Sequence, residues 1–208
     1  MAGTSRPCSH AHSSMNPILL DFPDTFESER LTIRAPRPAD APQIVEAVIE
    51  SLNELRPWMP WAKEAPTLDH AIERLRQAAA KWITREDLLL HLFLKGTDTW
   101  VGGSGLHRIN WESRKFEIGY WVRTKFAGRG FVTEAVHAIT AFAFTQLKAN
   151  RVEIRCDAKN TRSAAVAKRC GFLLEGVLRH DSLGVDGDLR DTLLFSKISP
   201  DEFHLYDT

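Results

Sequence analysis

The chain has 208 residues, of which 43% are hydrophobic and 26% charged, a length and composition typical of a soluble globular protein with one sizeable core. Because 27 basic residues balance 27 acidic ones, the sequence excludes the overall positive charge expected of a general nucleic-acid-binding protein. No apolar run approaches the roughly 20 residues that a membrane span needs. We therefore expect neither nucleic acid nor a membrane as a partner.

The cysteines and the N-terminal segment suggest where the protein works. Cys8, Cys156 and Cys170 are odd in number and lack the paired spacing of metal ligands, so we expect reduced thiols, a cytoplasmic location and no metal site. Residues 1–20 are predicted to be a flexible extension, because they begin with Ser, His and small residues and lack the apolar core of a signal peptide. Residues 21–208 are predicted to form a single domain.

In chain order, the first predicted element is a strand at residues 30–34, where apolar and polar residues alternate. A helix follows, which Asp40 can cap and whose first turn suits Pro42. The prolines of segment 56–61 end this helix, and a second helix begins at about Leu68. The first part of the chain is therefore predicted to be a strand followed by two helices.

In the middle of the chain, dense apolar runs predict two antiparallel strands, at residues 88–94 and 100–111. A third strand at residues 116–122 places Glu117 and Trp121 on the same face, because side chains alternate along a strand. These three strands are predicted to belong to one sheet.

Five further elements are predicted after this strand: a helix from about Gly130, a strand at 151–156, a helix at 162–170 ended by Gly171, and strands at about 173–179 and 189–198. The order is therefore strand, two helices, three strands, helix, strand, helix and two strands. This order predicts a mixed α/β layer built on one sheet.

The segment Lys125-Phe126-Ala127-Gly128-Arg129-Gly130 lies between a strand and a helix, where free amides and the helix dipole favour an anion. Gly128 and Gly130 let the backbone approach a phosphate, and Lys125 and Arg129 add positive charge. By itself the pattern is equally typical of a tight turn. It is neither a Walker P-loop nor a dinucleotide fingerprint.

This segment resembles the acyl-CoA loop of the Gcn5-related N-acetyltransferase (GNAT) superfamily. Other segments follow in the order of that family: Arg30-Leu31-Thr32-Ile33-Arg34, Arg56-Pro57-Trp58-Met59-Pro60-Trp61, Glu117-Ile118-Gly119-Tyr120-Trp121, Thr133-Glu134-Ala135, Asn160-x-x-Ser163, Gly171-Phe172 and Glu175-Gly176. They resemble the RimJ/RimL-like branch, which includes enzymes that acetylate the N-termini of ribosomal proteins. The resemblance covers about residues 25–200. Lys125 departs from it, since glutamine or arginine is usual there.

The resemblance implies a GNAT fold, with a central mixed, mostly antiparallel sheet of about seven strands, about four flanking helices and a splay between the fourth and fifth strands. It also implies that acetyl-CoA is the acyl donor and that backbone groups around Trp121 and Val122 hold its pantetheine arm like an added strand. Asn160 is implied to bond this arm, although its position fits a helix cap equally well. The implied donor-binding residues are Trp121, Val122, Lys125, Ala127, Gly128, Arg129, Gly130, Phe131, Asn160 and Ser163.

Attack of an amine on a thioester needs a neutral amine and a proton for the leaving thiolate. The resemblance implies that Glu117 deprotonates the amine through water and that Ser163 donates to the sulfur. An exposed strand carboxylate and a capping serine are the structural alternatives. Asp181 lies near another acidic position of the family, and Ala167 replaces the tyrosine that many members use as an acid. Glu134 is expected to orient the loop.

We therefore predict the transfer of an acetyl group from acetyl-CoA to a primary amine by direct attack in a ternary complex. The acceptor is predicted to be a protein N-terminus, such as that of a ribosomal protein, or a small amine. Trp58, Trp61 and His107 are predicted to line its cleft, although core packing explains them as well. A non-catalytic acyl-CoA-binding or sensor module is the main alternative. Dimerisation stays open.

Overall fold

The computed structural model describes residues 16–200. Residues 1–15 of the expected extension, including Cys8, lie outside the described residues, as do residues 201–208 at the end of the predicted domain. Within the described part of the extension, Pro17–Leu19 forms a 3-10 helix, and the Leu20 carbonyl accepts a hydrogen bond of 2.8 Å from Arg85 Nη2.

The described residues form eight strands and four α-helices. The strands are β1 Thr25–Glu27, β2 Leu31–Arg34, β3 Leu88–Leu94, β4 Trp100–Asn110, β5 Lys115–Val122, β6 Arg151–Asp157, β7 Leu173–Leu183 and β8 Leu189–Lys197. The helices are α1 Ala41–Leu55, α2 Leu68–Thr84, α3 Phe131–Thr145 and α4 Thr161–Arg169, with short 3-10 helices at Pro38–Asp40, Pro60–Ala62 and Thr124–Phe126. None of the helices in this part of the chain is long and apolar enough to cross a membrane.

All eight strands form one sheet in the order β1-β2-β3-β4-β5-β6-β8-β7. Every neighbouring pair is antiparallel except β5 and β6, which are parallel. This confirms the predicted mixed, mostly antiparallel sheet. The additional strand is β1, a three-residue edge strand that pairs Phe26 with Ile33 of β2.

Strands β5 and β6 diverge soon after they begin. Their pairing joins only Lys115–Glu117 to Arg151–Glu153, and ends with Glu117 opposite Glu153. Beyond this point β5 continues to pair with β4, and β6 with β8. The edge of β5 that faces β6 therefore has no strand partner over residues 118–122. This confirms the predicted splay, because β5 and β6 are the fourth and fifth strands when the additional β1 is not counted.

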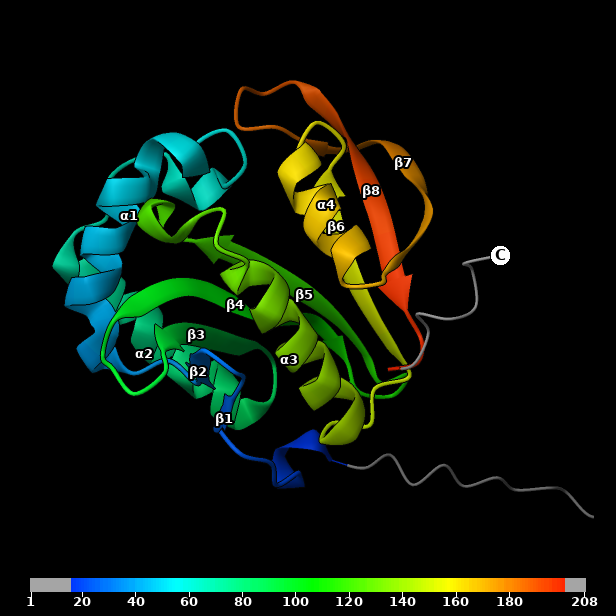
Figure 1. The fold of residues 1–208 in the computed structure, drawn as a ribbon, viewed down its shortest axis with the longest axis horizontal. Helices are drawn as coiled ribbons and strands as arrows, with labels where there is room; N and C mark the ends of the chain where they lie inside the picture. The colour runs from blue at the N-terminus through cyan, green and yellow to red at the C-terminus, as the bar shows by residue number, and fades with distance from the viewer. Residues whose placement is uncertain (1–15, 201–208) are drawn as a thin grey trace, which may run out of the picture.

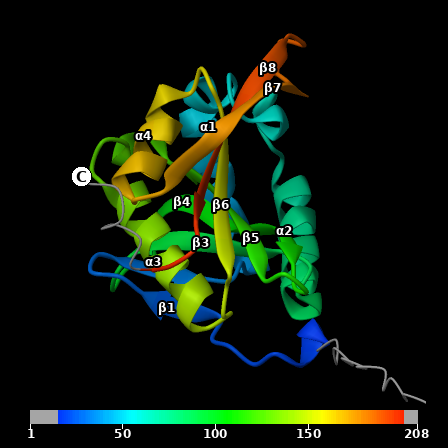
Figure 2. The same ribbon diagram turned by 90° about the vertical axis from the view of Figure 1, so that its right-hand side faces the viewer.

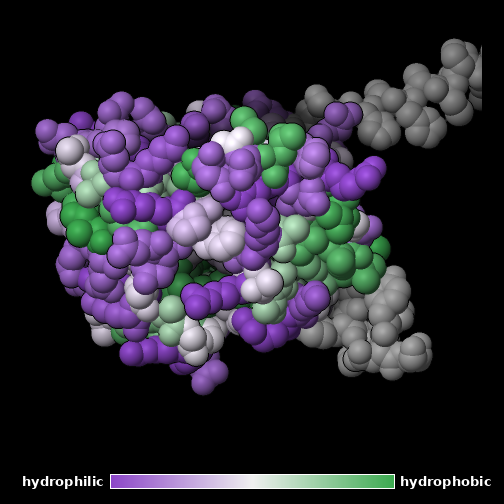
Figure 3. Space-filling view, turned by 90° about the horizontal axis from the view of Figure 1, so that it is seen from above, coloured by the Kyte–Doolittle hydropathy of each residue, from purple (hydrophilic) through white to green (hydrophobic). Residues whose placement is uncertain are grey.

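The helices cover both faces of the sheet. Helix α2 lies on one face, whereas α3 and α4 lie on the other (Figures 1 and 2). Helix α1 packs beside α2 through Ala41, Ala71 and Leu75. The main core lies between the sheet and α3, where Phe116 and Ile118 of β5 are fully buried. The face seen from above is mainly hydrophilic and is hollowed near its middle (Figure 3).

Asp40 does not act as the predicted side-chain cap of the first helix, because its carboxylate has other partners. It accepts hydrogen bonds from Arg34 Nη2 at 2.6 Å and from the Arg37 amide at 3.0 Å, and it lies 3.0 Å from His91 Nδ1. Burial acts to raise the pKa of Asp40, but the bonds from His91 and Arg34 outweigh it and hold this pKa well below its ordinary value. The carboxylate therefore ties β2 and β3 to the start of α1.

Candidate active site

The predicted phosphate loop connects β5 to α3. Gly128 and Gly130 have φ values of +74° and +80°, in the left-handed region that glycine adopts readily, and Gly130 directly precedes the first residue of α3. Ala127 to Gly130 are exposed, whereas the Phe131 side chain is buried. Because the first amides of a helix lack intrahelical partners, the N-terminus of α3 presents N–H groups and a positive dipole end at this loop. The arrangement suits a bound phosphate.

Glu134 is connected to this loop through Arg30. Its carboxylate accepts hydrogen bonds from Ser28 Oγ at 2.7 Å, from the Arg30 amide at 2.7 Å and from Arg30 Nε at 2.6 Å. Arg30 Nη1 in turn donates to the Arg129 carbonyl at 3.1 Å. Burial acts to raise the pKa of Glu134, but the bonds from Ser28 and Arg30 lower it. The expected orienting role of Glu134 thus has a physical route, through the connection between β1 and β2.

Helix α1 holds the other end of the loop, which the sequence did not indicate. Arg123 is buried and donates to Glu46 at 2.5 Å and to Glu50 at 2.8 Å. The Lys125 amide also donates to Glu50, at 3.2 Å, while Lys125 Nζ lies 3.9 Å from the same carboxylate. Glu50 therefore partly neutralises the positive charge of Lys125. Arg129 contributes the second cation of the loop.

Glu117 lies where β5 and β6 diverge. Its side chain is 16% exposed, and Arg108 Nη1 donates to Glu117 Oε2 at 3.0 Å. Burial raises the pKa of Glu117, and this effect exceeds the opposing effects of the charges on Arg108, Arg155 and His107. A carboxylate with a raised pKa is a better proton acceptor than an ordinary one at neutral pH.

Asp181, the other acidic candidate, has the opposite shift. Arg155 Nη2 donates to Asp181 Oδ2 at 2.8 Å, and hydrogen bonds from Thr192 and Arg155 lower the pKa of Asp181. The charges of Arg108 and Arg155 act on both carboxylates, so Asp181 lies in the same electrostatic neighbourhood as Glu117. Of the two, Glu117 is therefore better suited to accept a proton.

Ser163 and Asn160 lie at the start of α4. Asn160 Oδ1 accepts a hydrogen bond from the Ser163 amide at 3.1 Å, so Asn160 caps the helix, as one of its two sequence interpretations required. Ser163 Oγ donates to the Tyr120 hydroxyl at 3.0 Å, and this hydroxyl donates to the Ser163 carbonyl at 2.9 Å. Burial raises the pKa of Tyr120, so the phenol stays neutral. Sequence reasoning missed Tyr120, although it stands inside the quoted strand motif.

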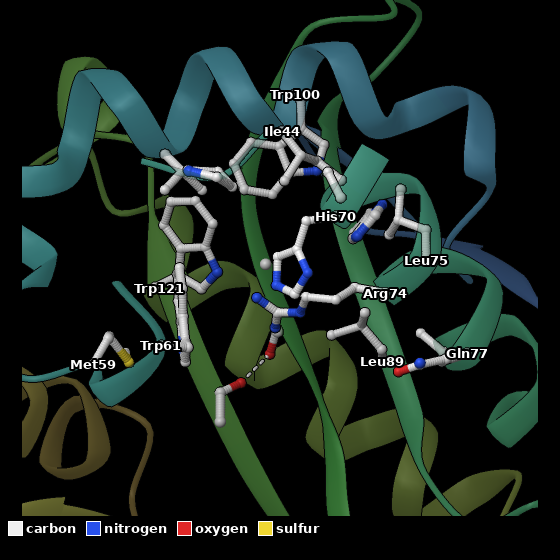
Figure 4. Close-up of a pocket in the computed structure, with 18 of the residues that line it drawn as sticks. Ile44, Met59, Trp61, His70, Arg74, Leu75, Gln77, Leu89, Trp100 and Trp121 are labelled. Carbon is white, nitrogen blue, oxygen red and sulfur yellow. Dashed lines mark hydrogen bonds between the residues drawn. The ribbon is translucent and has the colours of Figure 1, made fainter. Parts of the chain in front are cut away.

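A cavity of about 820 Å³ opens between α1, α2 and strands β3 to β5. Of the three residues expected around the acceptor, Trp61 and His107 are in its lining and Trp58 is not. Trp121, expected to contact the donor, also lines it. The Trp61 and Trp121 rings lie 5.5 Å apart between centroids. Figure 4 shows His70 and Arg74 of α2 reaching toward these two tryptophans. The cavity thus has an aromatic wall on one side and basic groups on another.

Asp87 is a second residue of this cavity that the sequence did not indicate. It directly precedes β3, and its Oδ2 lies 2.8 Å from His107 Nδ1 on β4. His107 is also the cross-strand partner of Glu117. A carboxylate, an imidazole and a second carboxylate are therefore consecutive neighbours at the point where β5 leaves β6.

Comparison with known proteins decides the family. The model of the acetyltransferase (GNAT) domain family matches residues 30–173. The chain belongs to the GNAT family of acetyltransferases. The putative ribosomal N-acetyltransferase YdaF of Bacillus subtilis (strain 168) is 34% identical over 173 residues, which cover 81% of this chain and 91% of that protein.

Solved structures agree with this family. A probable acetyltransferase is 30% identical, with a TM-score of 0.77, over 84% of this chain and 97% of its own. The microcin C7 self immunity acetyltransferase MccE, solved with acetyl-CoA and AMP, has a TM-score of 0.78 at 24% identity over 86% of this chain and 98% of its own, and so supports the fold. The chain is thus an N-acetyltransferase that transfers an acetyl group from acetyl-CoA to an amine. Within residues 16–200, no group of three or more His, Cys, Asp and Glu residues could hold a metal ion.

Proposed function

We propose that the acceptor is the N-terminal amine of a protein, of the kind found on ribosomal proteins, and that it attacks acetyl-CoA directly in a ternary complex. The similarity to a putative ribosomal N-acetyltransferase supports this acceptor class. The cavity of about 820 Å³ has the size of a ligand pocket and accommodates the first residues of a peptide. A small amine is the second acceptor class, because the same cavity takes one without a change in the fold.

The donor occupies the loop and the splay. The N-terminus of α3, with Arg129 and the partly shared charge of Lys125, receives the pyrophosphate of acetyl-CoA. The pantetheine arm lies along the free edge of β5 around Trp121 and Val122, because unpaired backbone groups bind an extended ligand as they bind a strand. Asn160 contributes from the start of α4 while it also caps that helix.

The chemistry takes place where the splay meets the cavity. Glu117 promotes loss of the amine proton, which its raised pKa favours. Ser163 donates a proton to the departing sulfur, for which its hydroxyl turns from Tyr120 to the sulfur. Tyr120 fixes the position of Ser163, because its own hydroxyl donates to the Ser163 carbonyl. The single observation that carries this proposal is that β5 leaves β6 at Glu117, on the strand that carries Trp121 of the cavity and ends at the phosphate loop.

Direct attack also fits the cysteines. Cys156 and Cys170 are buried, and burial raises the pKa of both thiols, that of Cys170 to about 12. Because the thiolate is the nucleophilic form of cysteine, neither is suited to carry an acetyl group between donor and acceptor. The two cysteines therefore favour direct transfer in a ternary complex over transfer through a cysteine acyl-enzyme.

Initial rates of thiol release, measured with acetyl-CoA and a panel of N-terminal peptides and small amines, test both parts of the proposal. Intersecting lines in double-reciprocal plots are expected for a ternary complex, and parallel lines would instead indicate an acyl-enzyme. Mass spectrometry of the products should find the added acetyl group on the N-terminal amine of the best peptide. Exclusive acetylation of small amines would contradict the protein acceptor. Binding of acetyl-CoA without turnover of any amine would favour the sensor module.

A cytoplasmic location completes the proposal, because Cys156 and Cys170 are free thiols and ribosomal proteins are cytoplasmic acceptors. Fractionation of cells that express the full chain tests it. Sedimentation of the purified chain determines whether two copies associate.

A further inference from the structure

The His107 ring packs over two glycines, Gly105 and Gly119, on the face of the sheet that the cavity occupies. Gly105 and Gly119 are cross-strand partners on β4 and β5. A Cβ added to Gly105 would lie 2.8 Å from His107 Nε2, and one added to Gly119 would lie 3.3 Å from the same atom. The edge of the ring that carries Nε2 therefore lies over this pair of glycines, in space that any other residue type would fill.

The position of the His107 ring over Gly105 and Gly119 lies between the cavity and Glu117. Trp121, Gly119 and Glu117 share one face of β5, since side chains alternate along a strand. Trp121 and Gly119 line the cavity, whereas Glu117 is not part of its lining. Because the His107 ring lies over Gly119, an acceptor amine that passes Trp121 meets His107 Nε2 before it reaches Glu117.

Asp87 determines which nitrogen of His107 is free. An ionised carboxylate only accepts hydrogen bonds, so at 2.8 Å from Asp87 Oδ2 the Nδ1 atom of His107 must be the donor. The lone pair of the neutral imidazole is then on Nε2. The His107 side chain is 30% exposed and belongs to the lining of the cavity, so a ligand in the cavity can reach the ring. Orientation of a base by a hydrogen-bonded carboxylate is the arrangement that serine hydrolases use for their histidine.

We propose that His107 Nε2 is the atom that takes the proton from the acceptor amine and that Asp87 is the positioning residue that fixes the His107 tautomer. This deepens the proposed acetyl transfer and rests on it. Glu117 then promotes proton loss as the cross-strand neighbour of His107, because its negative charge stabilises the imidazolium that forms.

The ammonium gives one proton to His107 Nε2, and the nitrogen of the neutral amine forms a bond to the thioester carbonyl carbon. The carbon–sulfur bond breaks with its electron pair going to sulfur, and the second proton of the former ammonium leaves the new amide nitrogen. That second proton is relayed through the Ser163 hydroxyl to the sulfur, so that coenzyme A leaves as the thiol. The imidazolium finally loses its proton to water.

The decisive experiment compares the pH dependence of kcat/KM in the wild type, His107→Gln and Asp87→Asn, with the best amine acceptor. Loss of a general base costs about 10²- to 10⁴-fold in rate. We expect a loss in this range for His107→Gln, with disappearance of the acidic limb that reports the base. Added imidazole should restore part of the rate. Asp87→Asn should lower kcat, because an asparagine oxygen or amide no longer enforces the productive tautomer.

Binding of acetyl-CoA, followed by calorimetry, should be unchanged in both variants, which separates a catalytic defect from misfolding. Gly119→Ala provides a second test that changes neither His107 nor Asp87. Its Cβ would displace the His107 ring by a few tenths of an ångström. It should lower kcat without changing donor affinity. His137→Gln, on the exposed side of α3, is the matched histidine control and should keep the wild-type pH profile.

The inference is overturned if His107→Gln keeps its rate within a few-fold and its acidic limb, while Glu117→Gln loses both. Glu117 would then be the base and the Asp87–His107 pair structural. A wild-type protein that acetylates no amine at any pH would instead refute the proposed function. The two failures are therefore distinguishable.

Discussion

The left-handed backbone at Gly128 gives the sharpest test of the donor loop. Gly128 has a φ of +74°, and a Cβ added there would meet no atom within 4 Å. Gly128→Ala therefore changes backbone strain alone, by about 1–2 kcal/mol for a residue held in the left-handed region. For a chain of this size, that strain lowers the melting temperature by about 2–8 °C.

The effect on acetyl-CoA follows from the same strain. If the free loop of Gly128→Ala instead relaxes out of the left-handed region, the strain no longer lowers the melting temperature. Binding must then restore the conformation, and 1–2 kcal/mol weakens affinity by about 5- to 30-fold. Gly96 is a matched control, because its φ is also +74° and its surroundings are equally open, but it lies in the turn between β3 and β4. Gly96→Ala should lower the melting temperature similarly and leave acetyl-CoA affinity unchanged.

Calorimetric titration with acetyl-CoA and thermal melts of the two variants decide the matter. Equal acetyl-CoA affinity in Gly128→Ala and Gly96→Ala, with a wild-type melting temperature for Gly128→Ala, would refute the assignment of this loop to the donor. A selective loss in Gly128→Ala would assign the loop to the donor independently of any turnover measurement.

Three further predictions concern single side chains. Glu117→Gln should lower kcat by at least tenfold at neutral pH with unchanged acetyl-CoA affinity, measured by initial rates and calorimetry; an unchanged kcat would remove Glu117 from the mechanism. Ser163→Ala should lower kcat and cost about 1 kcal/mol of stability, because the Tyr120 hydroxyl loses a partner. Asp40→Asn should cost about 3–5 kcal/mol at pH 7, as breaking a buried ion pair does. Because the pKa of Asp40 is lowered in the folded state, this stabilisation is present above the ordinary aspartate pKa and is lost as the pH falls below it. Denaturant titrations at pH 7 and pH 3 should therefore show a smaller difference between wild type and variant at the lower pH.

The elements that the sequence predicted well are those with a strong local pattern. The dense apolar run at 88–94 became β3 with the same bounds, and Gly171 ends α4 with a φ of +72°. Strand β1 was missed because three residues, only one of them partly buried, carry too short an alternation to detect. Local periodicity therefore predicted the core of the sheet better than its edge.

Contacts between distant parts of the chain limited the prediction of the site. Arg123 meets Glu46 and Glu50 across more than 70 residues, and Asp87 meets His107 across 20. No local pattern records such pairs, so Asp87 was not singled out and Asp40 was assigned to a cap instead of to Arg34 and His91. Segment 125–130, by contrast, was expected between a strand and a helix, and it does connect β5 to α3, with positive φ values at Gly128 and Gly130.

The divergence of β5 from β6 also bears on how the protein avoids aggregation through unpaired strand edges. An unpaired strand edge at the margin of a sheet invites pairing with another molecule. Here the unpaired stretch of β5 lies inside the sheet, and the three-residue pairing with β6 closes the wedge at one end. The protein can thus keep an open row of backbone donors and acceptors in its interior without offering a template for aggregation.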